Sequence, residues 1–212
     1  MTTPLPLILS APSGGGKTTI AKRLLERRAD IGYSVSCTTR RPRPGEVDGK
    51  DYYFLSQLEF EAARDRGEFA EWAEVHGRMY GTLQREVRRV LDSGRHVLMD
   101  IDVQGAMQFR KVFPEAVLVF VLPPSAEVLL ARLKARKTES RETLVTRLQS
   151  ALAELRALGE YEYVVENDDL EAAVSRVSSI LDAEVVRRER TRNLEGRVAA
   201  LAAALEREIA AT

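Results

Sequence analysis

The sequence is poor in residues that form covalent or metal cross-links. Its 212 residues include one cysteine, Cys37, and two histidines. A single cysteine excludes an internal disulfide and a cysteine-rich zinc site. The aromatic content is low as well, at 6%, but 44% of the residues are hydrophobic, which is enough to form a folded core.

The chain also lacks an excess of charge and a long apolar run. Its 32 basic residues balance 32 acidic ones, so the basic surface typical of nucleic-acid-binding proteins is not expected. No apolar stretch approaches the roughly 20 residues that span a bilayer. The short apolar run Leu5–Leu9 has no basic segment before it, unlike a secretory signal. We therefore expect a cytoplasmic protein whose partners are neither nucleic acid nor membrane.

Short apolar runs alternate with helical patterns along most of the chain. The runs are Leu5–Ser10, His96–Ile101, Val117–Leu122 and Tyr163–Val165. They lack polar alternation, which is typical of strands covered on both faces. Strands that alternate with helices predict an α/β fold, with a mainly parallel sheet flanked by helices.

Three segments depart from this alternation. Residues 34–84 contain several prolines and glycines and a capping box, Ser56-Gln57-Leu58-Glu59, and are predicted to form an inserted mixed α/β lobe. Residues 126–158 are predicted to be helical and are rich in arginine. Residues 191–212 form an amphipathic helix that can pack on the body or pair with a second copy, so monomer and homodimer both stay open. The core then comprises 5–33, 85–125 and 159–190 within a domain of 5–190.

A glycine-rich loop lies between the first predicted strand and the first helix. It reads Ala11-Pro12-Ser13-Gly14-Gly15-Gly16-Lys17-Thr18-Thr19. Glycines let backbone N–H groups converge on a phosphate, Lys17 reaches the β- and γ-phosphates, and the Thr18 hydroxyl ligates Mg²⁺. A chance glycine-rich turn is the alternative, but the position between strand and helix favours a P-loop, with alanine where the commonest pattern has glycine. Asp100, at the end of another strand, is predicted to help hold Mg²⁺; a simple strand-end turn is its alternative.

The inserted lobe begins with a basic, proline-rich segment. Arg40, Arg41 and Arg43 fall within four positions, next to two prolines. Guanidinium groups bind phosphate oxygens in pairs, so this segment predicts a second phosphate site; a solvated basic loop is the alternative. Tyr52 and Tyr80 can add hydroxyl donors, although tyrosines in such patterns often serve packing.

Several motifs together resemble those of guanylate kinases. They are the segment 34–51, Glu71, Tyr80-Gly81-Thr82, Asp100-Ile101-Asp102-Val103-Gln104-Gly105, Pro123-Pro124-Ser125 and Asn167-Asp168-Asp169, and the match runs from about Leu7 to Leu181. The resemblance implies a P-loop NTPase-type core, a GMP-binding lobe at 34–84 and a helical lid at 126–158. It also implies Mg²⁺-dependent transfer of phosphate from ATP to GMP, giving ADP and GDP.

The resemblance also implies roles for individual residues. ATP is expected at the glycine-rich loop, with Asn167 near its adenine, and the metal would be held by Thr18 and Asp100. The GMP phosphate would be held by Arg40, Arg43, Tyr52 and Tyr80, and guanine would be recognised by Ser36, Glu71, Thr82 and Asp102. The catalytic residues would be Lys17, Arg132, Arg136 and Arg147. Guanine presents two donors, N1–H and the exocyclic amine, that suit a carboxylate. Adenine has no N1–H, so the same carboxylate disfavours it. For Glu71 the residues alone leave an exposed strand charge as an equal alternative.

One departure from the family pattern and two rival functions remain. The chain reads Ala135-Arg136-Lys137-Thr138 where relatives usually have an Arg-Gly step, so the position of the lid hinge is open. An inactive guanylate-kinase-like module that binds a peptide is the first rival, although such modules typically have a degraded phosphate loop. A kinase of a sugar phosphate is the second, and it would leave Glu71 and Ser36 without a role.

Overall fold

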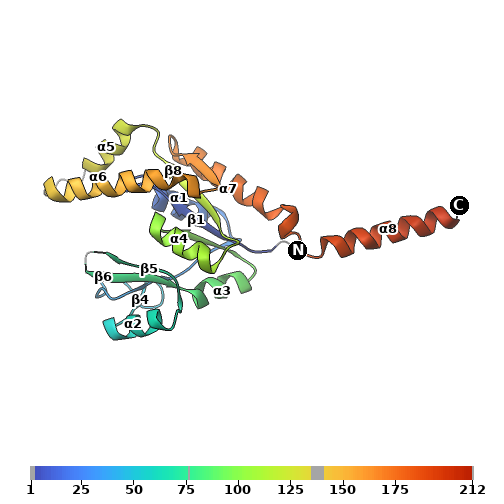
Figure 1. The fold of residues 1–212 in the computed structure, drawn as a ribbon, viewed down its shortest axis with the longest axis horizontal. Coiled ribbons are helices and arrows are strands. Elements are labelled where there is room, and N and C mark those ends of the chain that lie inside the picture. Colours follow the sequence, from blue (N-terminus) through green and yellow to red (C-terminus); the bar gives the residue numbers. More distant parts are fainter. Residues whose placement is uncertain (1–2, 76, 135–140, 212) are drawn as a thin grey trace.

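A parallel sheet forms the centre of the molecule. The computed structural model describes residues 3–75, 77–134 and 141–211, and Figure 1 shows their arrangement. Within these ranges the larger sheet has the strand order β2-β7-β1-β8-β9, and each of its pairings is parallel. The strands are β1 (Pro6–Ser10), β2 (Ile31–Tyr33), β7 (His96–Asp100), β8 (Val117–Leu122) and β9 (Tyr163–Glu166). The predicted α/β fold with a mainly parallel sheet is confirmed.

Helices cover both faces of this sheet. They are α1 (Lys17–Arg27), α3 (Gln84–Asp92), α4 (Val103–Val112) and α7 (Leu170–Val185). Alternate residues of β1 pack to opposite sides: Leu7 and Leu9 join α1 and α7 in one hydrophobic cluster, and Ile8 joins α3 and α4 in the other. A strand with two covered faces has no polar side to show, which explains the uninterrupted apolar runs of the sequence.

The inserted lobe has its own small sheet and its own core. The sheet order is β4-β3-β6-β5, mixed in direction, with α2 (Gln57–Asp65) beside it. Its strands are β3 (Cys37–Thr38), β4 (Tyr53–Phe54), β5 (Phe69–Val75) and β6 (Arg78–Leu83). The predicted capping box begins α2: Ser56 Oγ accepts from Glu59 N at 3.2 Å, and Glu59 Oε2 accepts from Ser56 N at 2.8 Å. Phe60 stacks on Phe69 at the centre of the lobe, with ring centroids 4.4 Å apart.

Two helices lie on the far side of the core from this lobe (Figure 1). They are α5 (Ala126–Lys134) and α6 (Arg141–Arg156), followed by a short 3₁₀ helix, η1 (Ala157–Glu160). Leu129, Leu133 and Ala151 form a hydrophobic cluster of their own. The helical prediction for this segment is therefore confirmed where it is described.

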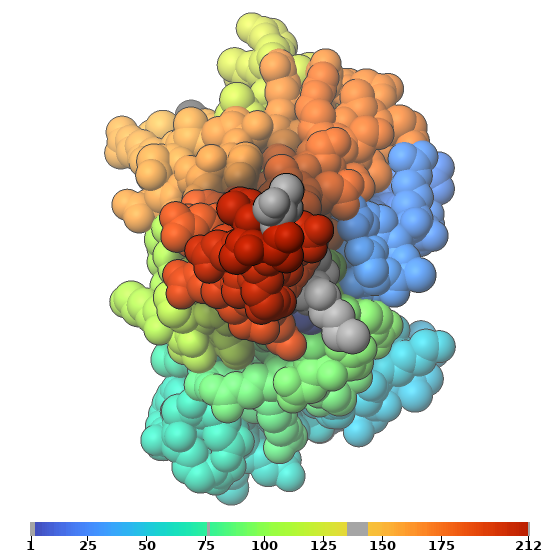
Figure 2. Space-filling model, turned by 90° about the vertical axis from the view of Figure 1, so that its right-hand side faces the viewer, coloured from blue at the N-terminus to red at the C-terminus, as the bar shows by residue number. Residues whose placement is uncertain are grey.

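The C-terminal helix projects away from the body. α8 (Leu194–Ala211) extends from one end of the molecule in Figure 1 and is seen nearly end-on in Figure 2. None of its residues is buried, and Val198, Leu201, Leu205 and Ile209 are between 55% and 76% exposed. Packing of this helix on the body, one of the two alternatives, is therefore not what the structure shows; pairing with a second copy stays a prediction.

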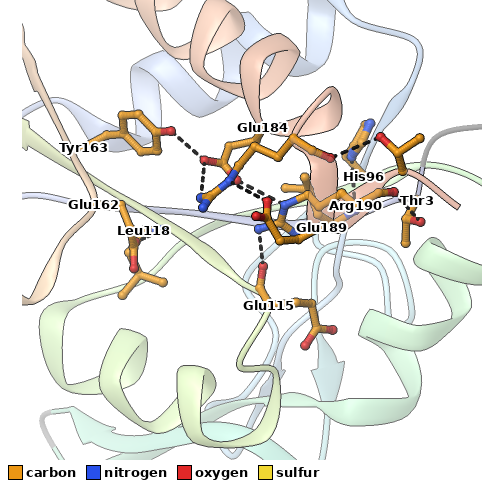
Figure 3. A network of polar contacts seen from close by, with 12 residues as sticks. Thr3, His96, Glu115, Leu118, Glu162, Tyr163, Glu184, Glu189 and Arg190 are labelled. Carbon is orange, nitrogen blue, oxygen red and sulfur yellow. Dashed lines mark hydrogen bonds and ion pairs between the residues drawn. The ribbon is translucent and has the colours of Figure 1, made fainter. Parts of the chain in front are cut away.

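A buried carboxylate anchors the segment that leads into α8. Figure 3 shows Glu184, only 1% exposed, accepting hydrogen bonds from Tyr163 Oη at 2.5 Å and Arg190 Nε at 3.1 Å. Arg190 belongs to a short 3₁₀ helix, η2 (Arg188–Arg190), and it also donates to the Glu115 carbonyl at 2.9 Å. Thr3 Oγ1 donates to the Arg190 carbonyl at 3.1 Å. The chain is thus fixed to the core up to the residues just before α8.

Across the described ranges, the helices are each too short or too polar to traverse a bilayer.

Candidate active site

The glycine-rich loop connects the central strand β1 to α1, as predicted. Gly14 and Gly16 have φ of +84° and +94°, a conformation that side chains disfavour. A Cβ on Gly16 would lie 2.3 Å from Asn167 Nδ2. Gly15 N donates to the Pro12 carbonyl at 2.7 Å and closes the turn. The loop shape therefore depends on these glycines, and Lys17 follows as the first residue of α1.

Side chains from three distant segments hold the backbone of this loop. Asn167 Nδ2 donates to the Gly15 carbonyl at 2.8 Å, and Arg132 Nη1 from α5 donates to the Gly14 carbonyl at 3.4 Å. Ser13 N donates to Glu154 Oε2 on α6 at 3.0 Å. The sequence placed Asn167 and Arg132 near the nucleotide but did not indicate these bonds. Glu154 was missed altogether, because no local pattern marks a helix glutamate that meets a loop 141 residues away.

The end of β7 brings a carboxylate to the start of α1. Because β1 and β7 are parallel neighbours, with Leu9 opposite Asp100, Asp100 lies beside the loop. Thr18 Oγ1 donates to Asp100 Oδ2 at 2.6 Å, and Tyr33 Oη donates to Asp100 Oδ1 at 3.4 Å. Burial, and then the Asp100 charge, raise the pKa of Tyr33, so its hydroxyl stays protonated. Tyr33 was not predicted; it ends β2, a strand of three residues that is too short for a periodic signal.

The Thr18–Asp100 pair has the chemistry that Mg²⁺ requires. Mg²⁺ in nucleotide sites takes one or two protein oxygens and completes its shell with phosphate oxygens and water. A hydroxyl and a carboxylate 2.6 Å apart at the mouth of a phosphate loop match that donor set. The described residues contain no group of three or more His, Cys, Asp and Glu that could hold a metal by itself.

One cavity of about 470 Å³ joins the loop to the inserted lobe. Its size is that of a small-molecule site. The predicted residues that line it are Thr18, Ser36, Tyr52, Glu71, Tyr80, Asp100 and Asp102, and Lys22 and Tyr33 line it as well. The cavity therefore places the proposed metal ligands and the proposed base-reading carboxylates around the same space.

Two carboxylates meet at one side of this cavity. A Cβ atom on Gly105 would lie 3.1 Å from Glu71 Oε2 and 3.4 Å from Asp102 Oδ1, so the two carboxylates both lie next to Gly105. Burial, together with the Asp102 charge, raises the pKa of Glu71 to about 7, although the Thr82 hydroxyl bond opposes the shift. Thr82 is fully buried and donates to Glu71 Oε1 at 2.6 Å. Asp102 also caps α4 by accepting from Gly105 N at 2.7 Å.

The basic segment of the lobe is ordered by an acidic partner. Arg40 Nη1 and Nη2 donate to the two carboxylate oxygens of Glu46 at 2.9 and 2.8 Å, and Arg43 N donates to Glu46 Oε2 at 2.7 Å. The Arg40 bonds, then the Arg43 N–H, lower the pKa of Glu46 to about 2. Arg40 also lies 5.3 Å from the centre of the Tyr52 ring. Neither Arg40 nor Arg43 is among the residues that line the cavity, but the Arg40 guanidinium lies against the ring of Tyr52, which does line it.

The predicted arginines of the 126–158 segment are only partly placed. Arg132 reaches the loop backbone, as described above. Arg147 on α6 donates to the Leu133 carbonyl at the end of α5, at 2.9 Å. Arg136 and the predicted hinge near it lie outside the described residues.

Comparison with known proteins agrees with this geometry. The family model for guanylate kinase matches residues 3–184. A guanylate kinase from Aromatoleum aromaticum is 49% identical over 181 residues, which cover 85% of this chain and 89% of that one. A guanylate kinase from Caldanaerobacter subterraneus subsp. tengcongensis is 45% identical over 190 residues, covering 90% and 92%. The crystal structure of guanylate kinase from Anaplasma phagocytophilum aligns with a TM-score of 0.74 at 36% identity, covering 92% and 94%. With a family model over most of its length and relatives near half identity, the chain belongs to the guanylate kinase family.

Proposed function

We propose that this chain transfers the γ-phosphate of ATP to GMP with Mg²⁺, giving ADP and GDP. The observation that carries the proposal is the shared cavity: Thr18 and Asp100, at the phosphate loop, line the same space as Glu71 and Asp102. A donor triphosphate on the loop and an acceptor base beside the carboxylates would bring the two phosphates toward each other. Family membership supports the same reaction.

The chain's own residues supply binding, orientation and charge. The loop amides and Lys17 would hold the donor phosphates, and Thr18 and Asp100 would hold Mg²⁺, which neutralises phosphate charge when bound. Arg40, Arg43, Tyr52 and Tyr80 would grip the acceptor phosphate. Because phosphoryl transfer needs little covalent help, in-line placement of the two phosphates does most of the work.

The acceptor base is selected by hydrogen-bond polarity. Ionised Glu71 and Asp102 accept hydrogen bonds only, and guanine offers N1–H and the exocyclic amine. A hydroxyl such as that of Ser36 can donate to O6. Adenine would place a lone pair against a carboxylate, and a site that leaves buried polar groups unpaired rejects the wrong analogue by up to ~10⁴-fold.

A coupled assay of ADP formation tests the proposal. We expect turnover with GMP and far less with AMP or ribose 5-phosphate. Equal rates with all three acceptors would contradict guanine selection, and no turnover with any of them would favour the peptide-binding module. Adenine discrimination should weaken in Glu71→Gln and persist in Glu74→Gln, which changes an exposed glutamate of the same strand.

A second assay tests the loop. Lys17→Ala should abolish ADP formation while the circular dichroism spectrum stays native, because Lys17 is only partly buried and alanine favours the helix that begins there. Lys111→Ala, at an exposed position on α4, is the matched control and should behave like the wild type. Full activity of Lys17→Ala would contradict the role of the loop.

A further inference from the structure

A carboxylate of the helix α6 is hydrogen-bonded to the backbone of the phosphate loop. Glu154 Oε2 accepts a hydrogen bond from Ser13 N at 3.0 Å, across 141 residues of sequence. Burial raises the pKa of Glu154, while the Ser13 N–H and the Lys17 charge oppose that shift. A partly buried glutamate therefore lies close enough to the loop to bond Ser13 N and to feel the charge of Lys17, and none of the predicted residue roles includes it.

Glu154 lies on the same face of α6 as two residues that contact α5. Ala151, one turn earlier, is 3% exposed and packs with Leu129 and Leu133 of α5. Arg147 lies one turn before that and donates to the Leu133 carbonyl. Residues seven and three positions apart on an α-helix point to the same side. The face that packs α6 on α5 thus ends at the phosphate loop.

We propose that Glu154 is a positioning residue: it fixes α6 to the backbone of the phosphate loop and so shapes the ATP site before the nucleotide binds. The inference rests on the proposed function, because it takes ATP as the ligand of the loop. It adds a residue that acts through Ser13 and through the placement of α6, without contacting the substrate.

The hydrogen-bond arrangement explains why such a residue is needed. The loop carbonyls of Gly14 and Gly15 accept hydrogen bonds from Arg132 and Asn167, so two side chains already hold these carbonyls. Gly15 N donates within the loop, to the Pro12 carbonyl, whereas Ser13 N donates outside it, to Glu154 on α6. Removing the carboxylate leaves the Ser13 N–H without its acceptor and releases the loop from α6. Part of the ATP binding free energy would then be used to order the loop, and the measured affinity would fall.

Charge repulsion between Glu154 and ATP would change ATP affinity in the opposite direction. A negative charge near a triphosphate weakens its binding, so loss of Glu154 would improve ATP affinity if repulsion dominated. The variants Glu154→Ala and Glu154→Gln separate the two effects. Glutamine keeps an acceptor oxygen for Ser13 N but removes the charge, whereas alanine removes both.

Titration calorimetry with ATP and MgCl₂, and amide hydrogen exchange at Ser13, test the proposal. We expect Glu154→Ala to weaken ATP binding about tenfold and to speed Ser13 exchange, as loss of one hydrogen bond to the loop backbone would. GMP affinity should stay within about twofold, since the acceptor side is untouched. Glu154→Gln should stay close to the wild type in both measurements. Glu160→Ala, an exposed glutamate six residues further on, is the matched control and should change neither.

Other results would overturn the proposal. Wild-type or tighter ATP binding by a natively folded Glu154→Ala would mean that the carboxylate repels the ligand or does nothing. Equal losses in the alanine and glutamine variants would mean that charge, and not the bond to Ser13, matters. If the alanine variant does not fold, Glu154→Asp takes its place, with a shorter side chain and the same expected direction. Failure of the wild type to phosphorylate GMP would count against the proposed reaction alone, because ATP affinity and Ser13 exchange are measured without turnover.

Discussion

Individual side chains of the proposed acceptor site are held by partners that do not line the cavity. Arg40 is held by both oxygens of Glu46, and the same carboxylate ties down the backbone at Arg43. A guanidinium that is already oriented loses less conformational freedom when it meets a phosphate. The acidic residue in this basic segment would therefore serve the proposed phosphate site by ordering it.

The Glu46 bonds lead to a kinetic prediction. Glu46→Ala removes three charge-assisted hydrogen bonds and frees the loop, and we expect KM for GMP to rise about tenfold while KM for ATP stays unchanged. Steady-state kinetics with each substrate varied in turn measures this split. Glu74→Ala, on the exposed part of β5, serves as the control. A lower KM for GMP would show instead that Glu46 competes with the phosphate for Arg40.

Glu71 leads to a prediction about pH. Its pKa is raised to about 7 by burial, so in the free protein it gains a proton as the pH falls through 7. The protonated form accepts guanine N–H groups poorly, and kcat/KM for GMP should therefore fall below about pH 7. Between its ordinary pKa of 4.5 and 7, the unfolded chain releases this proton before the folded one does, so Glu71 lowers stability as the pH rises through that window.

Two profiles check the role of Glu71. In Glu71→Gln, kcat/KM for GMP should be low but should lose the decline that begins near pH 7. Thermal unfolding of this variant should show a stability advantage over the wild type that grows from pH 4.5 to 7 and then levels off. A wild-type profile that is flat through pH 7 would contradict the assignment.

The residue types at the site follow from the sequence, but their partners do not. Thr18, Glu71, Asp100 and Asp102 were named from motifs, and they line one cavity. Glu46 lies within the segment 34–51, and no role was predicted for it, because its contacts depend on how the loop folds back. Tertiary contacts of this kind leave no local spacing to detect.

At the scale of elements, the turn from β1 to α1 depends on backbone conformations that only glycine adopts cheaply. Gly16 has φ of +94°, and any Cβ there would meet Asn167 Nδ2 at 2.3 Å. We expect Gly16→Ala to weaken ATP binding by at least ~10²-fold, because both the loop and Asn167 must move. Calorimetric titration with ATP and MgCl₂ measures the loss.

Gly67 provides the matched control for this prediction. It also has a positive φ, +68°, but no atom lies within 4 Å of a Cβ built on it. Gly67→Ala should cost about 1 kcal/mol of stability and leave ATP affinity unchanged. Equal effects of the two substitutions on ATP affinity would show that strain in general, and not the loop, is responsible.

The predictability of the elements depended on burial and length. β1, β7 and β8 are covered on both faces and read as apolar runs, and the α2 capping box lies in four adjacent residues. β2 spans three residues and ends in Tyr33, which is 44% exposed, so it offered neither an apolar run nor an alternation. Elements with a local sequence signal were predicted. β2 was not predicted, because it is a strand only through its pairing with β7.

At the scale of the whole molecule, the hydrophobic core is divided into separate clusters, and this division bears on which parts can move relative to one another. The inserted lobe has its own cluster, and so do α5 and α6, apart from the two that cover the central sheet. Bodies with their own cores can shift against each other without breaking either core. The domain limits of 34–84 and 126–158 stay predictions, and these clusters are consistent with them.

α8 allows the sharpest prediction at this scale. Because none of its residues is buried, a chain that ends at Asn193 should unfold within ~2 °C of the full chain and keep its kcat. An isolated helix of this length contributes little stability in water. A chain that ends at Arg187 also loses Arg190, which leaves the buried Glu184 without one of its cationic partners, and should lose roughly 3 kcal/mol.

Differential scanning calorimetry of the three chains at two protein concentrations checks the prediction and also addresses the exposed stripe of Val198, Leu201, Leu205 and Ile209. If the stripe pairs with a second copy, the full chain gains stability with concentration and the chain that ends at Asn193 does not. Equal Tm values at both concentrations would mean that α8 adds nothing to stability through pairing. A large loss on removal of α8 alone, independent of concentration, would contradict the projecting position of the helix, since only contacts with the body could produce it.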